Sequence, residues 1–487
     1  SEGLADQIFY ELHRGTFTPE GTYEAALAKL PELVELGVTT LEILPLSSFP
    51  GGRGWGYDGV AHFAPDPSYG SPDALREFID AAHGFGLLVV LDVVYNHFGP
   101  AGNYLSLSSS RYFDASRQTR WGTPPAFSDA PMRRYVIENA LHWLDDFRFD
   151  GLRLDAAHEL FDESPEHIVQ ELVRRVRELS ETKFVVIEDD RNDARLKNEW
   201  GIDATWADDF HHAVHVLFTG EQGGYYEDYA PSLEALARTI ERGWLHDGTT
   251  ELRSGRTRGT NADELDAENF VYCLQNHDQI GNRAFGERLH HLTDVESFAL
   301  ASTLLLFLPM TPLLFMGQEW AASSPFLYFT DHEPELGALV SAGRRREFAG
   351  FSAFSSESAQ ERIPDPQAEA TFVRSRLDWT ERTREPHARM LDLYRKLIRF
   401  RKTDLVANVA RRRSELQVRV EGDLLVVTRA TLGGARRIFV GNFGDRAASL
   451  EGIVPEGAEV LVATRPVEGS RLGPRSGVIV AAEKESS

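Results

Sequence analysis

The sequence predicts an α/β protein whose main part is a (β/α)8 TIM barrel, and three observations carry this prediction. Eight short apolar runs alternate with amphipathic stretches over residues 1–402. Most runs precede a stretch in which apolar residues recur every three or four positions, as in a helix that packs on a sheet. Three of the runs end in a carboxylate, at the end of the strands where barrels build their active sites.

The eight expected strands are short runs of β-branched and other apolar residues, typical of parallel strands that are buried on both faces. In chain order they are Ile8–Glu11, Leu41–Leu46, Leu87–Tyr95, Gly151–Ala156, Phe184–Asp189, Ala204–Asp208, Phe270–Gln275 and Pro312–Met316. A doubly wound open sheet is the alternative, but no glycine-rich phosphate loop follows the first strand.

The expected helices connect these strands, and several begin at proline. Proline is tolerated in the first helical turn because the N–H that it lacks would be unpaired there in any case. Ser71 and Ser164 directly precede two of these prolines and are expected to cap the helices. The clearest helices are Thr22–Leu36, Pro72–Phe85, Pro131–Phe147 and Pro165–Leu179.

One stretch, Ser297–Met316, is almost entirely apolar and long enough to cross a bilayer. Pro309 and Pro312 interrupt it, and polar residues follow it at once. We therefore expect a buried helix, Phe298–Leu308, followed by a buried parallel strand, and not a membrane span.

Two insertions and a change of pattern divide the chain further. Residues 98–130 follow the third strand and form an expected loop subdomain, since loops of this length in a compact domain are usually functional. Residues 219–265 follow the sixth strand. Alternating runs with glycine-rich turns predict a C-terminal antiparallel β-sandwich domain over 403–487, so the catalytic barrel would span 1–402.

Composition excludes several classes of partner. The chain has 487 residues and a formal net charge of −24, which argues against nucleic acid or an anionic membrane. Its single cysteine, Cys273, excludes an internal disulfide and lies in an apolar run, where a buried unreactive thiol is expected. No basic and then apolar signal segment opens the chain, so we expect a cytoplasmic location. The sequence carries no signal for the oligomeric state.

Three carboxylate-tipped runs are the most specific feature of the sequence: Gly151–Asp155, Phe184–Asp190 and Val271–Asp278. A carboxylate at the mouth of a buried strand is costly, because desolvation disfavours its charge. Three of them in order, with Arg153 and His277 beside them, indicate a site built from acids for a polar, neutral substrate. Glycosidic bond cleavage requires such paired carboxyls.

Four segments resemble the short motifs of the α-amylase superfamily of glycoside hydrolases. They follow the order of that family, each at an expected strand end: Asp92–His97, Gly151–Asp155, Val186–Glu188 and Asn276–Asp278. Each is weak alone, but the four in order span most of the barrel. Further segments are similar to the maltooligosyltrehalose trehalohydrolase family: Gly54–Val60, Glu188–Asn192, Trp206–His212, Gly220–Tyr226 and Met316–Ala321.

The resemblance implies a retaining mechanism, in which two carboxyls lie about 5–5.5 Å apart. Asp155 would be the nucleophile, and Glu188 would be the general acid and afterwards the base. Asp278 would bind sugar hydroxyls and stabilise the oxocarbenium-like transition state. Arg153 would orient Asp155 and keep it ionised through a charge-assisted hydrogen bond.

The resemblance also implies substrate-binding residues, which offer hydroxyl partners and stacking faces to a non-reducing, α,α-1,1-linked disaccharide. A site built around hydroxyl partners penalises a substrate that leaves them unpaired. The set is Tyr57, Asp58, His97, Arg153, His158, Asp189, Trp206, Asp209, Phe210 and His277. Asp92 and Asn96 are expected to be scaffold residues of the site. Because no convincing set of oxygen ligands is present, we expect no metal and no cofactor.

The activity implied is hydrolysis of the α-1,4 bond next to the terminal trehalosyl unit of maltooligosyltrehalose, or of a related α-glucan, with release of trehalose. Two alternatives remain open. A transglycosylase of the glycogen-branching type has the same catalytic carboxylates. A catalytically inactive barrel used for binding would lose one of the three carboxylates, and all three are present here. The resemblance further implies an N-terminal β-sandwich, whereas this chain opens almost directly on its first expected strand.

Overall fold

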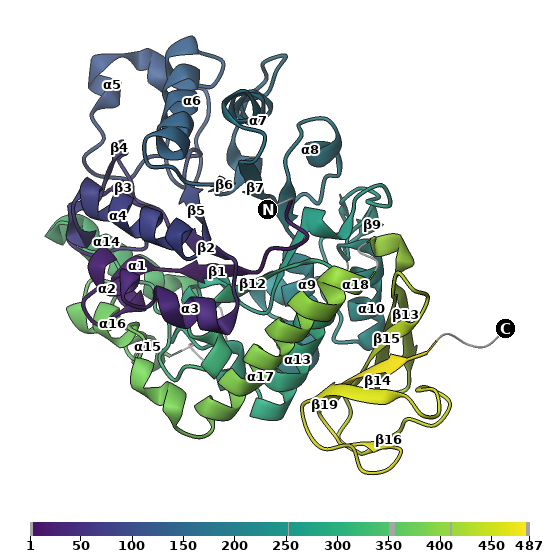
Figure 1. Ribbon diagram of the computed structural model, residues 1–487. Helices are drawn as coiled ribbons and strands as arrows, with labels where there is room; N and C mark the ends of the chain where they lie inside the picture. The colour runs from purple at the N-terminus through teal and green to yellow at the C-terminus, as the bar shows by residue number, and fades with distance from the viewer. Residues whose placement is uncertain (1–2, 252, 350–355, 410–411, 484–487) are drawn as a thin grey trace.

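The computed structural model describes residues 3–251, 253–349, 356–409 and 412–483. Eight parallel strands close into a barrel in the order β1-β12-β11-β8-β7-β6-β5-β2 (Figure 1). Their bounds are β1 Phe9–Leu12, β2 Thr40–Ile43, β5 Leu88–Val93, β6 Gly151–Leu154, β7 Phe184–Glu188, β8 Ala204–Trp206, β11 Phe270–Cys273 and β12 Thr311–Phe315. The predicted (β/α)8 TIM barrel is confirmed, and every strand overlaps its expected run.

Alternation along each strand divides the side chains between the helix layer and the barrel interior. Leu91 belongs to the main apolar core between strands and helices, whereas Val90 and Val186 belong to a second cluster inside the barrel. Two residues further along the same strands, on the same face, stand Asp92 and Glu188. The interior is therefore apolar toward the N-terminal ends of the strands and charged toward their C-terminal ends.

The longer helices surround the barrel or extend from its loops (Figure 1). Their bounds are α2 Tyr23–Leu27, α3 Leu30–Leu36, α4 Pro72–Gly84, α6 Ala130–Asp145, α7 Ile168–Leu179, α9 Asp208–Thr219, α10 Leu233–Arg242, α13 Val295–Phe307, α14 Pro334–Phe348 and α17 His387–Phe400. The cap predicted at Ser71 is confirmed, because its hydroxyl accepts a hydrogen bond from the Ala74 N–H at 3.1 Å.

Two helix predictions are wrong in detail. The stretch 22–36 forms two helices, because Pro31 lies in the first turn of α3 and cannot donate to a preceding helical turn. Helix α7 begins at Ile168 and not at Pro165. The Asp162 carboxylate accepts from the N–H groups of Ser164 at 3.0 Å and Ile168 at 2.7 Å, so the expected cap Ser164 lies in a turn before the helix.

The apolar stretch 297–316 forms α13 and then β12, as expected. Residues 297–307 of α13 are all buried, which explains the lack of a polar stripe along this helix. Within the part of the chain that the structure describes, no helix is long and apolar enough to cross a membrane.

Both insertions contain short elements. Residues 98–130 hold α5 Leu105–Ser108 and the 3-10 turn η2 Ser110–Tyr112, which Figure 1 shows beside α6. Residues 219–265 hold the 3-10 turn η4 Gly224–Tyr226, α10, and the strand pair β9 Thr249–Thr250 with β10 Thr257–Arg258.

The C-terminal part forms a five-stranded antiparallel sheet, in the order β13-β14-β15-β19-β17, with a separate strand pair β16-β18. The bounds are β13 Gln417–Glu421, β14 Leu424–Ala430, β15 Arg436–Asn442, β16 Ala448–Ser449, β17 Glu459–Ala463, β18 Arg471–Leu472 and β19 Ser476–Ala482. Val426 and Val440 pack with Leu472 on one face, while Val427 and Phe439 join the barrel core on the other. The predicted antiparallel domain is confirmed; its boundary at residue 403 stays a prediction.

We expect Phe439→Ala to lower the free energy of unfolding by about 3–5 kcal/mol, because it leaves a cavity between the sheet and α13. Phe439 is fully buried, and its ring centroid lies 5.9 Å from that of Phe307. Urea unfolding followed by circular dichroism measures the change. Leu432→Ala, at an exposed position of the same domain, is the matched control. Equal destabilisation by both substitutions would contradict this account of the interface.

Candidate active site

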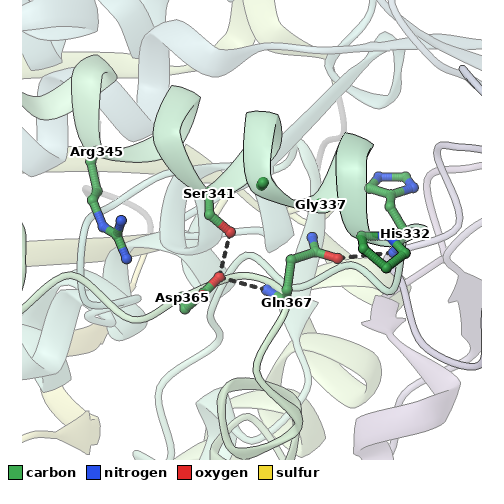
Figure 2. Close-up of a pocket in the computed structure, with 8 residues that line it drawn as sticks. His332, Gly337, Ser341, Arg345, Asp365 and Gln367 are labelled. Atoms are coloured by element: carbon green, nitrogen blue, oxygen red, sulfur yellow. Dashed lines mark hydrogen bonds between the residues drawn. The ribbon is translucent and has the colours of Figure 1, made fainter.

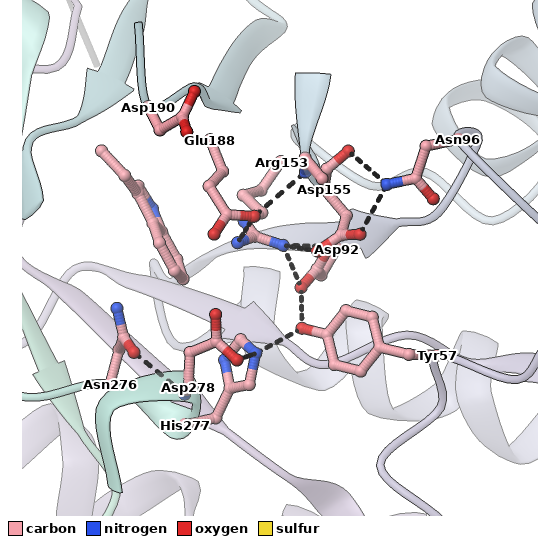
Figure 3. A network of polar contacts seen from close by, with 12 residues as sticks. Tyr57, Asp92, Asn96, Arg153, Asp155, Glu188, Asp190, Asn276, His277 and Asp278 are labelled. Atoms are coloured by element: carbon pink, nitrogen blue, oxygen red, sulfur yellow. Dashed lines mark hydrogen bonds and ion pairs between the residues drawn. The ribbon is translucent and has the colours of Figure 1, made fainter. Parts of the chain in front are cut away.

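The guanidinium of Arg153 lies at the centre of the carboxylate cluster, between three strand ends (Figure 3). Its Nη1 donates to both oxygens of Asp92, at 3.0 and 2.9 Å, and to Asp155 Oδ1 at 3.0 Å. Its Nη2 donates to Glu188 Oε2 at 2.7 Å. The strand register explains this arrangement, because Asp92 pairs with Arg153 across β5 and β6. Two of the three predicted catalytic carboxylates therefore contact one buried cation.

Asp155 and Glu188 are also fixed by the backbone that follows β6. The Asp155 N–H donates to the Val93 carbonyl at 3.0 Å, which keeps this residue at the strand end. Ala156 adopts a left-handed conformation, with φ of 39°, and its N–H donates to Glu188 Oε2 at 3.0 Å. A non-glycine residue in this region is strained, and such strain is typical of functional sites. The turn thus aims one amide at Glu188.

The side chain of Asn96 holds the other oxygen of Asp155. Its Nδ2 donates to Asp155 Oδ2 at 3.0 Å. Both carboxylate oxygens of Asp155 are therefore oriented by the protein, one by Arg153 and one by Asn96. The expectation that Asp92 and Asn96 are scaffold residues agrees with these contacts.

A second chain of contacts runs from β1 to Tyr57. Glu11 accepts from the ring of His277 at 2.5 Å and from its backbone N–H at 3.0 Å. His277 Nε2 lies 2.8 Å from the Tyr57 hydroxyl, which donates to Asp92 at 2.5 Å. Burial opposes a charge on His277, but Glu11 prevails and raises its pKa to about 9. His277 is thus a charged donor in the site at neutral pH.

Asp278 is the most open of the three predicted catalytic carboxylates. It lies in the first turn of the short helix α11 His277–Gly281, which the side chain of Asn276 caps. Asn282 donates to its Oδ1 at 2.8 Å, and 41% of the side chain is exposed. Figure 3 shows its carboxylate directed toward the space between Glu188 and Tyr57. This open carboxylate is available to a ligand.

Asp155 and Glu188, two of the three carboxyls that contact Arg153, form one ionisable pair. Burial and repulsion from Glu188 raise the pKa of Asp155 to about 8. Burial raises the pKa of Glu188 as well, but Arg153 and the Ala156 amide outweigh it and lower that pKa. The pair therefore holds one proton near neutral pH. Glu188 makes its contacts through Oε2, and its Oε1 has no partner among the described residues.

Several predicted substrate-binding residues surround this cluster. Trp206 pairs with Glu188 across β7 and β8, and the Arg153 guanidinium lies 4.0 Å from its ring centroid. His97 is stacked on Trp121 with 5.0 Å between centroids, and its Nε2 donates to the Tyr57 carbonyl at 2.9 Å. Contacts within the protein therefore hold both Trp206 and His97 in position. Sequence reasoning assigned no role to Trp121, which covers His97.

Two further predicted residues, Asp58 and His158, each lie beside an ionisable partner. Asp58 Oδ2 is 3.6 Å from His332 Nε2, and burial raises the pKa of this carboxyl. His158 Nδ1 is 3.6 Å from Asp190 Oδ1. In each pair the carboxylate oxygen and the ring nitrogen are too far apart for a hydrogen bond, so both remain able to bind sugar hydroxyls.

Three predicted substrate-binding residues are directed away from the cluster. Asp189 is buried and accepts hydrogen bonds from three groups of Arg191: the backbone N–H, Nε and Nη2. Asp209 accepts from the N–H groups of Leu245 and His246 at 2.7 and 3.0 Å, which fixes the 219–265 insertion. Phe210 is fully buried, and its ring is stacked on a core tyrosine. These three residues support the loops around the site.

Sequence reasoning gave no role to Glu11. Glu11 ended the first expected strand, so it was a further carboxylate-tipped run and could have been found by the same rule. Asp208 ended another expected strand, Ala204–Asp208, and the same rule indicates it. It opens α9, and burial together with the charges of Glu188 and Asp278 raises its pKa to about 7.

Two further features of the structure have polar linings. His158, Asp189 and Asp190 have potential metal ligand atoms within 4.8 Å of one another. Arg191 occupies the oxygens of Asp189, however, and a cation would have to displace it. A separate cavity of about 370 Å³ lies between α14 and the segment 365–367, lined by His332, Ser341 and Gln367 among others (Figure 2). It contains none of the clustered carboxylates.

Comparison with known proteins agrees with this geometry. Residues 7–125 match the family described as alpha amylase, catalytic domain. The chain is 52% identical over 443 residues to a protein of Deinococcus radiodurans named malto-oligosyltrehalose trehalohydrolase, covering 91% of this chain and 73% of that protein. A protein of the same name from Saccharolobus solfataricus is 42% identical over 406 residues, with 82% of this chain and 69% of that protein covered.

Solved structures agree in fold. A crystal structure of a Salmonella typhimurium protein assigned to the α-amylases is 39% identical, with a TM-score of 0.91 over 99% of this chain and 83% of that one. An Anoxybacillus α-amylase, at 18% identity and a TM-score of 0.69 over the full length of both chains, shares the fold alone. The extent and identity of the matches to the named relatives decide the assignment: this chain belongs to the malto-oligosyltrehalose trehalohydrolase family.

Proposed function

We propose that this protein is a retaining glycoside hydrolase that cleaves the α-1,4-glucosidic bond next to the terminal trehalosyl unit of maltooligosyltrehalose and releases trehalose. The observation that carries the proposal is the pair Asp155 and Glu188 on a single guanidinium. Because both contact the same guanidinium, the two carboxyls are neighbours, and a retaining mechanism needs a nucleophile and an acid as neighbours. The names of the relatives support the choice of bond and product.

In the first step Asp155 attacks the anomeric carbon, while Glu188 gives its proton to the departing glycosidic oxygen. Asp155 is suited to this role, because Arg153 and Asn96 orient both its oxygens. Glu188 is suited to the other, because its Oε1 has no partner among the described residues. Asp155 and Glu188 enter the reaction with one proton between them. A glycosidic oxygen near Glu188 accepts a hydrogen bond, which would favour the proton on Glu188 and leave Asp155 ionised.

In the second step Glu188 takes a proton from water, and the resulting hydroxide attacks the anomeric carbon and frees Asp155. Charge develops on the sugar ring in both transition states. Asp278 would bind hydroxyls of this ring, and His277, which contacts Glu11 and Tyr57, would hold Tyr57 in position and place a positive charge nearby. Tyr57, stacked on His277 with 5.2 Å between centroids, would lie under the same ring. Asp58 and His158 are proposed to bind the hydroxyls of the trehalosyl unit.

A glycogen-branching activity uses the same carboxylates, so the cluster alone does not decide between water and a sugar hydroxyl as acceptor. The comparisons favour hydrolysis. A protein of Leifsonia xyli named 1,4-alpha-glucan branching enzyme matches only 155 residues, at 38% identity, or 30% of this chain. The matches to proteins named trehalohydrolase extend over most of the chain. An inactive barrel is disfavoured, because Asp155, Glu188 and Asp278 are all present.

The proposal includes an α-glucan substrate, no bound metal and a cytoplasmic location. A net charge of −24 would repel polyanions, and a single cysteine is common in reducing compartments.

We expect the purified chain to release free trehalose from maltotriosyltrehalose and to attack plain maltooligosaccharides of equal length slowly. Chromatography of the products from both substrates measures this. Branched products would assign the protein to the transglycosylases, and the absence of turnover on both substrates would assign it to the inactive barrels.

We expect Asp155→Asn or Glu188→Gln to lower kcat by several orders of magnitude, because each removes a group that acts in the transition state. Circular dichroism should show an unchanged fold. Asp189→Asn is the control: this neighbouring acid faces Arg191, and its loss should reduce kcat far less. Near-parental activity in either catalytic variant would show that the roles are assigned to the wrong residues.

The shared proton predicts a basic limit to activity. As the pH rises through about 8, the pair of Asp155 and Glu188 loses its proton, and Glu188 can no longer act as an acid. We therefore expect kcat/KM to fall tenfold per pH unit well above that value. Initial rates between pH 5 and 10 measure the profile. A rate that stays constant to pH 10 would exclude this pair as the proton source.

A further inference from the structure

The segment Gly220–Tyr226 is a family-like motif to which the catalytic chemistry assigns no role. It leaves the end of α9 through Gly220 and closes into the turn η4. Gly224 has a φ of 62°, in the left-handed region that favours glycine, so the turn depends on this residue type. The chain therefore follows one defined path here, and its aromatic residues have fixed positions.

Glu221 ties the start of this turn to the active-site side of the barrel. Its carboxylate accepts from Arg283 at 2.8 and 2.9 Å and contacts His215 Nε2 at 2.8 Å. Arg283 follows α11, the helix that carries Asp278. Arg344 of α14 donates to the carbonyls of Gly281 and Arg283, at 2.8 and 2.9 Å, and so holds α14 against the same segment.

Tyr226 anchors the end of the turn. It is buried, its ring is stacked on His215 with 4.1 Å between centroids and 9° between planes, and its hydroxyl lies 3.3 Å from His211 Nε2. Glu221 and Tyr226 thus hold the turn on both sides of its tip, and the residue directly before Tyr226 lies at that tip.

That residue is Tyr225, and 68% of it is exposed. Its hydroxyl is within electrostatic range of Asp278, of Arg120 in the 98–130 insertion, and of Arg344 and Glu347 in α14. Charged groups from three parts of the rim therefore act on this ring, and one of them belongs to the catalytic cluster. Glu221 also ties this turn to Arg283, directly after the helix that carries Asp278, so the exposed ring lies on the active-site side of the barrel.

An exposed aromatic ring on a turn held in this way suits sugar binding. A tyrosine offers a large rigid face and a polar tip, and it has few rotatable bonds, so it binds at a low cost in conformational entropy. Hexose rings present C–H groups on one face and hydroxyls at their edge. The Tyr225 ring suits the C–H face, and the charged side chains around it suit the hydroxyls.

We propose that Tyr225 is a sugar-stacking residue of the substrate cleft, which binds a glucosyl ring adjacent to the one that Asp155 attacks. The proposal rests on the proposed function, since it names a contact to the same substrate. The ring could belong to the glucan chain or to the trehalosyl unit, and both offer the same stacking chemistry.

The experiment measures affinities by calorimetry in the inactive full-length variant Asp155→Asn, with Tyr225→Ala or Tyr225→Phe added. We expect Tyr225→Ala to weaken binding of maltotriosyltrehalose between about two- and tenfold, and Tyr225→Phe to preserve it. Phe85→Ala is the matched control: Phe85 is also an exposed aromatic, but it follows α4 at the opposite end of the barrel strands. Its removal should change no affinity.

Maltotetraose and trehalose, titrated separately, distinguish the two sources of the ring. Weaker binding of maltotetraose assigns Tyr225 to the glucan side, and weaker binding of trehalose assigns it to the leaving-group side. Unchanged affinity for all three sugars would overturn the proposal, as would equal losses in Tyr225→Ala and Tyr225→Phe. Turnover by the parent chain is measured in parallel. A failure to release trehalose would count against the proposed function. The ratio of affinities with and without the Tyr225 substitution tests the role of Tyr225 independently.

Discussion

The buried guanidinium of Arg153 is the interaction on which the active-site rim depends. Burying this cation alone would be costly, and burying Asp92, Asp155 and Glu188 together without it would bring three negative charges into contact. Each member is stable in its place only because the others are present. The three strands β5, β6 and β7 are therefore joined by charge at their carboxyl ends and by apolar packing at the opposite ends. Trp206 completes the arrangement by covering one face of the guanidinium.

The barrel could be predicted from the sequence because its strands follow a simple physical rule. A parallel strand covered by helices is apolar on both faces, so each strand is recognisable as a short run with sharp ends. Side-chain alternation then places Asp155, Glu188 and Arg153 on the inner face without further information. The predictions that were wrong concern the boundaries of individual helices. Pro31 divides one helix, and the Asp162 turn delays another, because both depend on hydrogen bonds that apolar spacing does not reveal.

The substrate-binding set could be predicted only in part, for a geometric reason. Asp189 follows Glu188 directly, but alternation turns it away from the cluster, and Arg191 holds it there. Asp209 and Phe210 lie in the first turn of α9, where successive side chains point in different directions around the helix axis. Asp208 is the member of that turn whose charge meets Glu188 and Asp278. The resemblance to the family identifies the start of α9, but the direction of each side chain around the helix axis decides which residue faces the active site.

The contact between Glu11 and His277 has a consequence for the synthesis of the protein. It joins residues that are 266 positions apart, and β1 acquires its second neighbour only when β12 is in place. During synthesis from the N-terminus, β5, β6 and β7 can pair early, whereas Tyr57 and His277 acquire their final partners only after most of the chain has emerged. Contacts of such separation form slowly, because the loop between their ends must first be closed. The first strand of the barrel therefore completes its contacts only when nearly the last strand has been made, and a ribosome-bound fragment that stops before β11 has no complete sugar site with which to engage glucan.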